Sequence, residues 1–216
     1  MIISRSLRVL ALAAGLALPA AAVAGPSILD SWTTVPMPPP PEIKPVSVDS
    51  AHTALLLLDF LAPNCTDQQR PRCVKTLPAL QKLLADARAH KIKVIYSAGA
   101  VTPTSLPPDP APAIARQDGE AMVRAPVDKF YNSDLEKMLK DGGITTVIVT
   151  GTSAEGAVLS TASSAAIRGL TVIVPLDGMS SVNPFRELYT AWHLRNAPAA
   201  LSSHVTLTTT DKITMK

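Results

Sequence analysis

The sequence is poor in cysteine, in charged residues and in aromatic residues. Its 216 residues include two cysteines, 17% are charged and 4% are aromatic. Two cysteines are too few for a disulfide-dense scaffold or for a zinc site built from two CxxC pairs. A chain that is 47% hydrophobic and carries so few charges is also unlike a disordered protein. Length and composition therefore predict one domain with a sizeable core.

The first residues of the chain have the pattern of a secretory signal peptide. Arg5 and Arg8 precede an apolar run from Val9 to Val23, and Ala22–Ala24 fits a signal-peptidase cleavage site. The run of about 15 residues is short for a membrane-spanning helix, so we expect no stable membrane anchor. We expect residues 1–24 to be removed near Ala24 and the protein to be exported, periplasmic or secreted. An uncleaved N-terminal anchor is the alternative.

The formal charge of +3 comes mostly from this segment. Taking away its two arginines from the 20 Lys and Arg residues leaves 18 basic residues against 17 acidic ones. The remaining sequence has no cluster of Lys and Arg and few aromatic residues, which argues against a nucleic-acid partner.

Beyond the signal peptide, a proline-rich segment precedes a region of alternating patterns. Residues 25–50, with four prolines at Pro38–Pro41, favour an extended polyproline II arm that acts as a tether; a recognition segment for a proline-binding partner is the alternative. In residues 51–216 short apolar runs alternate with segments of helical periodicity. We expect strands over 53–59, 92–97, 144–150, 171–175 and 204–208, and helices over 74–90, 133–140, 155–168 and 184–195.

Continuous apolar strands joined by helices predict a three-layer α/β/α sandwich with a mostly parallel, Rossmann-like sheet. Ligands bind such sheets at the carboxyl ends of the strands. Asp59 ends the first predicted strand, Ser97 ends the second, and Thr150–Gly151 ends the third. Asp59 is therefore a candidate general acid or base. An aspartate that caps the following turn is the alternative.

Several motifs in the same order resemble the isochorismatase-like cysteine hydrolase superfamily. The stretch TGTSAEGAVLSTASSAA begins at Thr150 and resembles the family's turn into a helix, which reads roughly G-x-x-x-x-x-C-V-x-x-T-A. LLLLDF around Asp59, VDKFYNSDLEKML around Lys129 and the late segment TAWHLRNAPAALSSHVTLTTTDKI extend the resemblance over about residues 51–214.

The resemblance implies a catalytic set of an acid at Asp59, a lysine at Lys129 and a cysteine at a helix N-terminus. The cysteine position is Ala157 in this sequence. Because alanine has no nucleophile, the thioester route is closed at this position. Family members that hydrolyse isochorismate also lack this cysteine and are thought to use the acid and water. We therefore expect a hydrolase of a small molecule that uses Asp59 and Lys129 with bound water. A catalytically inactive small-molecule binding protein is the alternative.

The resemblance also assigns further residues to the pocket. Thr152 and Ser153 fall where the family has a non-proline cis peptide, and a backbone N–H there, together with that of Ala157, would form an oxyanion hole. Glu155 is an added acid near the helix N-terminus, where it either complements the helix dipole or serves as a substitute acid or base. Members of the superfamily commonly form dimers or tetramers, so a homo-oligomer is expected.

The two cysteines and the four histidines have no metal-binding spacing. Cys65 and Cys73 are eight positions apart, and in an oxidising compartment we expect them to form a disulfide. The alternative is that Cys65 is a displaced nucleophile. The histidines, at positions 52, 90, 193 and 204, show no H-x-H, H-E-x-x-H or D-x-H pattern, and there is no glycine-rich phosphate loop. We expect no metal and no cofactor.

Overall fold

The computed structural model describes residues 27–99, 108–198 and 200–216. The chain divides into two units, residues 1–37 and 38–216. The described part of the first unit contains one short helix, α1 (Ile28–Ser31). The predicted signal peptide, residues 1–24, lies outside the described residues. Within the described ranges, no helix has both the length and the apolar character needed to cross a membrane.

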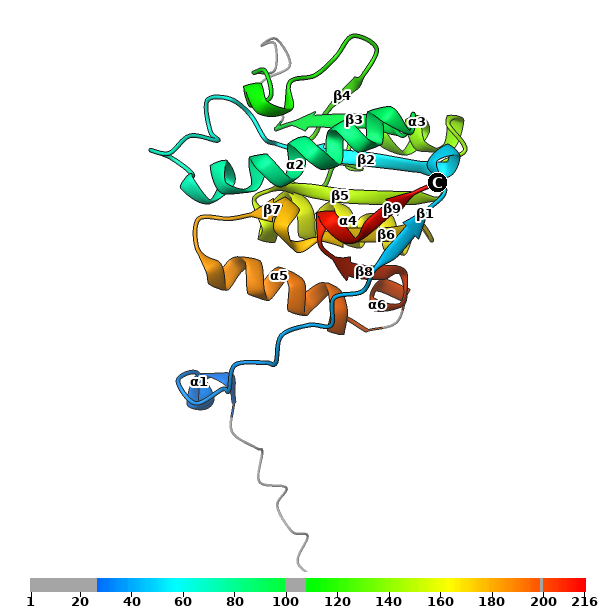
Figure 1. The fold of residues 1–216 in the computed structure, drawn as a ribbon. Helices are drawn as coiled ribbons and strands as arrows, with labels where there is room; N and C mark the ends of the chain where they lie inside the picture. The colour runs from blue at the N-terminus through cyan, green and yellow to red at the C-terminus, as the bar shows by residue number, and fades with distance from the viewer. Residues whose placement is uncertain (1–26, 100–107, 199) are drawn as a thin grey trace, which may run out of the picture. The chain divides into compact units, whose positions relative to one another are not determined.

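The second unit is built around a seven-stranded sheet with strand order β4-β3-β2-β5-β6-β8, in which β7 pairs with the end of β5 (Figure 1). The paired strands run parallel. Their bounds are β2 (Thr53–Leu58), β3 (Lys93–Ala98), β4 (Ala121–Arg124), β5 (Thr146–Thr152), β6 (Thr171–Pro175), β7 (Met179–Ser180) and β8 (Val205–Thr208).

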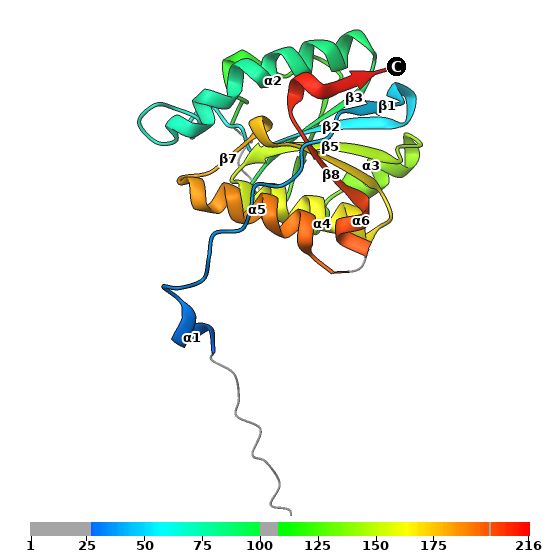
Figure 2. The same cartoon turned by 60° about the horizontal axis from the view of Figure 1, so that its bottom comes forward.

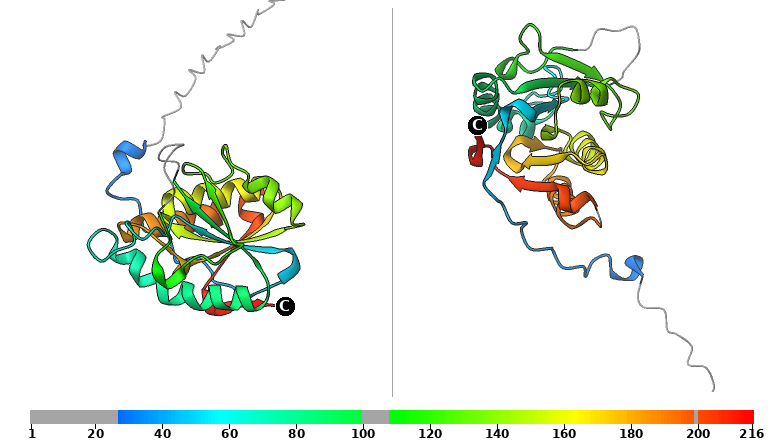
Figure 3. Two further views of the ribbon diagram at one scale, coloured as in Figure 1. Left: turned by 90° about the horizontal axis from the view of Figure 1, so that it is seen from above. Right: turned by 90° about the vertical axis from the view of Figure 1, so that its right-hand side faces the viewer.

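Helices cover both faces of this sheet, which confirms the predicted three-layer α/β fold. Leu56 and Leu58 of β2 pack with buried residues of α3 (Leu135–Asp141), α4 (Leu159–Ile167) and α5 (Pro184–Asn196). Leu55 and Leu57 point to the opposite face, where they pack with α2 (Pro71–Ala89). Figures 2 and 3 show α2 on one side of the sheet and α4 and α5 on the other. A short helix, α6 (Ala200–His204), precedes β8.

Two short strands near the ends of the second unit form a separate parallel pair, β1 (Val46–Val48) and β9 (Ile213–Met215). Val48 and Met215 are buried in the same cluster as the α2 face of the sheet. The sequence pattern places residues 46–48 in the proline-rich arm, but the apolar side chains of Val46 and Val48 join this cluster. They therefore belong to the folded unit.

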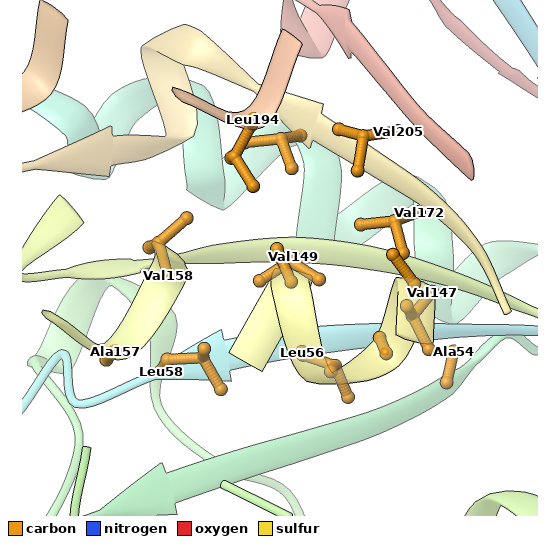
Figure 4. Close-up of a cluster of buried hydrophobic side chains, with 14 of the residues drawn as sticks. Ala54, Leu56, Leu58, Val147, Val149, Ala157, Val158, Val172, Leu194 and Val205 are labelled. Atoms are coloured by element: carbon orange, nitrogen blue, oxygen red, sulfur yellow. The ribbon is translucent and has the colours of Figure 1, made fainter. Parts of the chain in front are cut away.

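A close approach at Gly151 fixes how the segment after β5 meets the sheet. A Cβ atom on Gly151 would lie 2.8 Å from Leu58 Cβ and 2.9 Å from Val158 Cγ2. The segment predicted as one helix over residues 155–168 begins with a π-helical turn, Ala154–Val158, and continues as α4. Figure 4 shows Ala157 and Val158 on this turn, at the end of the buried cluster where Leu58 ends β2.

Candidate active site

The site lies where the chain changes direction across the sheet. β2 is at the centre, β3 and β4 extend the sheet to one side, and β5, β6 and β8 extend it to the other. Such a switch point opens a crevice at the carboxyl ends of the strands. A cavity of about 300 Å³ lies there, lined by Asp59, Leu61, Asn64, Arg70, Gly99, Pro126, Val127, Thr152, Ser153, Gly156 and Ala157.

Asp59 follows β2 directly and is held in one orientation by two side chains. Its backbone has a positive φ of 57°, a conformation that short polar residues tolerate better than most. Ser97 Oγ donates to Asp59 Oδ1 at 2.8 Å, and Lys129 Nζ donates to Asp59 Oδ2 at 2.8 Å. Both carboxylate oxygens therefore accept a hydrogen bond, while the side chain stays 21% exposed at the cavity.

Lys129 is a buried cation whose hydrogen bonds are complete. Its side chain is 0% exposed. Besides Asp59, Nζ donates to the carbonyl oxygens of Pro126 at 2.6 Å and Ala125 at 3.2 Å. Its backbone N–H donates to Thr161 Oγ1 at 3.1 Å. An ammonium group has three hydrogens and no lone pair, so these three acceptors match a protonated lysine.

Residue 157 adjoins this charge pair through the shared cavity. Ala157 is 4% exposed and lines the cavity together with Asp59. The peptide bond between Thr152 and Ser153 is cis, and both residues line the same cavity. The structure thus brings together Asp59, Thr152, Ser153 and Ala157 around one space, with Lys129 behind Asp59.

Glu155, a candidate pocket residue, lies outside this cavity. Its carboxylate accepts a hydrogen bond from Ser181 Oγ at 2.6 Å and from Arg186 Nη1 at 2.8 Å. Burial opposes the ionisation of Glu155, but hydrogen bonds from Ser181, its own backbone N–H and Arg186 outweigh burial and hold the pKa of this carboxyl below its usual range. Residues two apart on a helical turn face different sides, which explains why Glu155 does not point where Ala157 does.

The two cysteines form the predicted disulfide between the loop after β2 and the first turn of α2. Their Cα atoms are 5.4 Å apart. The chain contains two cysteines, and both belong to this bridge, so no free thiol remains. Cys65 is therefore not a displaced nucleophile in this structure.

The structure adds two residues of the same loop to the cavity, Asn64 and Arg70. Arg70 Nη1 donates to Thr152 Oγ1 at 3.3 Å, a contact between positions 82 residues apart. Neither residue belongs to a recognisable motif. Their position shortly after the carboxyl end of a predicted strand is the one feature of the sequence that points to the cavity. In the described parts of the chain, no group of three His, Cys, Asp or Glu residues could hold a metal ion.

A parallel α/β sheet with a cavity at its switch point defines a Rossmann-like fold, and the cavity lies where such folds usually bind ligands. The Isochorismatase domain family matches residues 53–206, most of the chain. The chain therefore belongs to the isochorismatase family and has its hydrolase fold. No curated protein matches the sequence significantly.

Solved structures show the same fold. An isochorismatase-like hydrolase from Alkaliphilus metalliredigens is 25% identical, with a TM-score of 0.66, and the match covers 74% of this chain and 95% of that one. N-carbamoylsarcosine amidase from Thermoplasma acidophilum is 19% identical, with a TM-score of 0.62 and coverage of 74% and 96%. The nicotinamidase SaPncA from Staphylococcus aureus is 18% identical, with a TM-score of 0.63 and coverage of 72% and 99%.

Proposed function

We propose that this protein is an exported hydrolase of a small molecule, in which Asp59 and Lys129 act with a bound water molecule instead of a cysteine thioester. The observation that carries the proposal is the contact between a fully buried lysine and a partly exposed aspartate beside Ala157. Burying a charge costs several kcal/mol unless it is paired and hydrogen-bonded. A cavity that only needed apolar packing would gain nothing from this pair.

The hydrogen bonds of Lys129 support a mechanism in which Asp59 carries out the proton transfers. Lys129 uses all three ammonium hydrogens and has no free lone pair, so it cannot act as a base. Asp59 lines the cavity and accepts two hydrogen bonds, as an ionised carboxylate does. In the proposed reaction Asp59 takes a proton from water while the water oxygen attacks the carbonyl carbon of an amide or ester. Asp59 then gives this proton to the leaving group, and the bond from carbon to the leaving group breaks.

Ala157 suits a reaction in which water is the nucleophile. Its small side chain leaves room for the substrate, and it cannot form a covalent intermediate. The names of two relatives of this fold, an amidase and a nicotinamidase, make a small amide the first substrate class to test. The competing proposal is that the protein binds a small molecule without turning it over. The absence of a nucleophile at Ala157 favours this second proposal.

A screen of small amides and esters with matched variants separates these two functions. We expect Asp59→Asn to lower kcat by about 10²- to 10⁴-fold, the usual contribution of a general base. Asp86→Asn makes the same chemical change at an exposed position of α2 and should keep full activity. If wild type and Asp59→Asn were equally inactive while one compound raised the Tm of both, the protein would be a binding protein.

A second test restores the family nucleophile. We expect Ala157→Cys to hydrolyse small amides in a reaction that iodoacetamide abolishes, because the new thiol would adjoin the Asp59–Lys129 pair. Ser160→Cys places a thiol on the next turn, outside the cavity, and should gain no activity. Absence of thiol-dependent turnover in Ala157→Cys would contradict the role given to this position.

Export is supported by the N-terminal pattern and by the disulfide, because disulfides persist mainly in oxidising compartments. We expect the mature chain to begin at Gly25 and to fractionate with periplasmic or secreted proteins. N-terminal sequencing of the full-length gene product tests this. A cytoplasmic protein that retains residue 1 would contradict it.

A further inference from the structure

Among the described residues that line the cavity, Arg70 is the one charged residue that the proposed reaction does not use. Arg70 lies on the loop between β2 and α2. Asp59, at the start of this loop, and Asn64 also line the cavity. The charges of Asp59 and Lys129 balance each other. Arg70 forms no ion pair with the described residues, and its side chain donates a hydrogen bond to the neutral Thr152. The site therefore has one positive charge in excess.

The backbone around Arg70 is held on both sides. Arg70 N–H donates to Thr66 O at 2.8 Å, and Arg70 O accepts from Cys73 N at 2.9 Å. The Cys65–Cys73 disulfide closes the loop around these contacts. A bridge and two local hydrogen bonds thus restrict where the guanidinium group can lie, on a loop that has no regular strand or helix until Pro71.

We propose that Arg70 recognises a carboxylate on the substrate and that the Cys65–Cys73 disulfide positions it for this contact. This inference rests on the proposed function, because it names the substrate class of the same cavity. A guanidinium group offers parallel N–H donors that match the two oxygens of a carboxylate. A singly charged carboxylate balances the single positive excess, whereas a doubly charged phosphate would leave negative charge next to Asp59. A cavity of about 300 Å³ suits a molecule of about ten non-hydrogen atoms.

Benzoate and benzyl alcohol test this recognition apart from turnover. They are similar in size, differ in charge, and contain no bond that the proposed reaction cleaves. Isothermal titration calorimetry on the oxidised protein should give a Kd for benzoate about ten- to a hundredfold below that for benzyl alcohol, the range of a charge-assisted hydrogen bond. Arg70→Gln should reduce this preference to about twofold. Arg70→Lys should keep part of this preference, because lysine keeps the positive charge but lacks the parallel N–H donors of the guanidinium group.

A matched control removes one charge on α2, the helix that follows Arg70. Lys75→Gln changes an exposed residue of α2 that does not line the cavity, and it should leave the benzoate preference unchanged. An unchanged preference in Arg70→Gln, or a wild type that does not prefer benzoate, would overturn the proposal. If inorganic phosphate bound more tightly than benzoate, the proposal that Arg70 recognises a carboxylate would be wrong, and the site would be one for phosphate. If the preference holds while no amide or ester is hydrolysed, the proposed function fails and the carboxylate site stands.

The role of the disulfide has its own readout. Cys65→Ser/Cys73→Ser should lower the benzoate preference at least threefold, and it should have no further effect in the Arg70→Gln background, since the bridge acts through Arg70. Circular dichroism monitors the fold, and wild type reduced with dithiothreitol provides the same measurement if the double variant does not fold. A full benzoate preference without the bridge would refute the positioning role.

Discussion

Replacing Lys129 by methionine keeps most of the length of the side chain and removes its charge. In the structure this leaves Asp59 without its cation and leaves the carbonyl oxygens of Ala125 and Pro126 without a donor. Breaking a buried pair by removing one partner costs about 3 to 5 kcal/mol. Asp59 stays 21% exposed and keeps its hydrogen bond from Ser97, so the lower end of this range, about 3 kcal/mol, applies here. We expect Lys129→Met to lower the free energy of unfolding by about this amount.

Urea unfolding at pH 7, followed by circular dichroism, measures this change. The double variant Asp59→Asn/Lys129→Met removes both charges, so its loss should be smaller than the sum of the two single losses. Lys137→Met is the matched control. Lys137 pairs with Asp141 on the surface, where the side chains are 72% and 61% exposed, and water screens such a pair, so this variant should lose little stability. A loss below about 1 kcal/mol for Lys129→Met would refute the buried-pair reasoning.

Two further predictions concern stability. Burial opposes the ionisation of Glu120, but hydrogen bonds from Arg88 outweigh burial and hold the pKa of this carboxyl below its usual range. The ionised Glu120 therefore stabilises the fold above its unfolded-state pKa, and this stabilisation is lost as the pH falls through its folded-state pKa. In urea titrations, Glu120→Gln should lose less stability than wild type between about pH 5 and pH 3. Identical pH profiles of the two proteins would contradict this. Gly151→Ala would place a methyl group 2.8 Å from Leu58 Cβ and should destabilise the fold by about 1 to 3 kcal/mol; an unchanged urea midpoint would disprove the close approach.

The main strands could be predicted because they are continuous apolar runs buried on both faces. β2 reads TALLLL, and all six of its residues are buried. β4 could not be predicted because only one of its four residues, AMVR, has a buried side chain, Val123, so it shows no long apolar run. β1 and β9 escaped because each has three residues, and their pairing joins positions far apart in the sequence. Short segments of this kind carry little local signal.

In the site, positions carried by the family resemblance could be predicted, and positions set by long-range contacts could not. Asp59 and Lys129 lie in recognisable segments, and the structure joins them at 2.8 Å. The sequence places Glu155 near a helix N-terminus, two residues before Ala157, but it does not show that the side chain turns away from the cavity toward Ser181 and Arg186. Arg70 reaches the cavity from a loop that the disulfide closes, and it contacts Thr152, 82 positions away; no local pattern specifies such long-range contacts.

The way Lys129 is held has a consequence for how this site can change. The acceptors that fix it are the Asp59 carboxylate and the carbonyls of Ala125 and Pro126, and none of them belongs to residue 157. A substitution at position 157 therefore alters what can attack a substrate without disturbing the charge pair. The electrostatic part of the site and the nucleophile position are separable, so the same scaffold can keep its charge pair while the attacking group is exchanged.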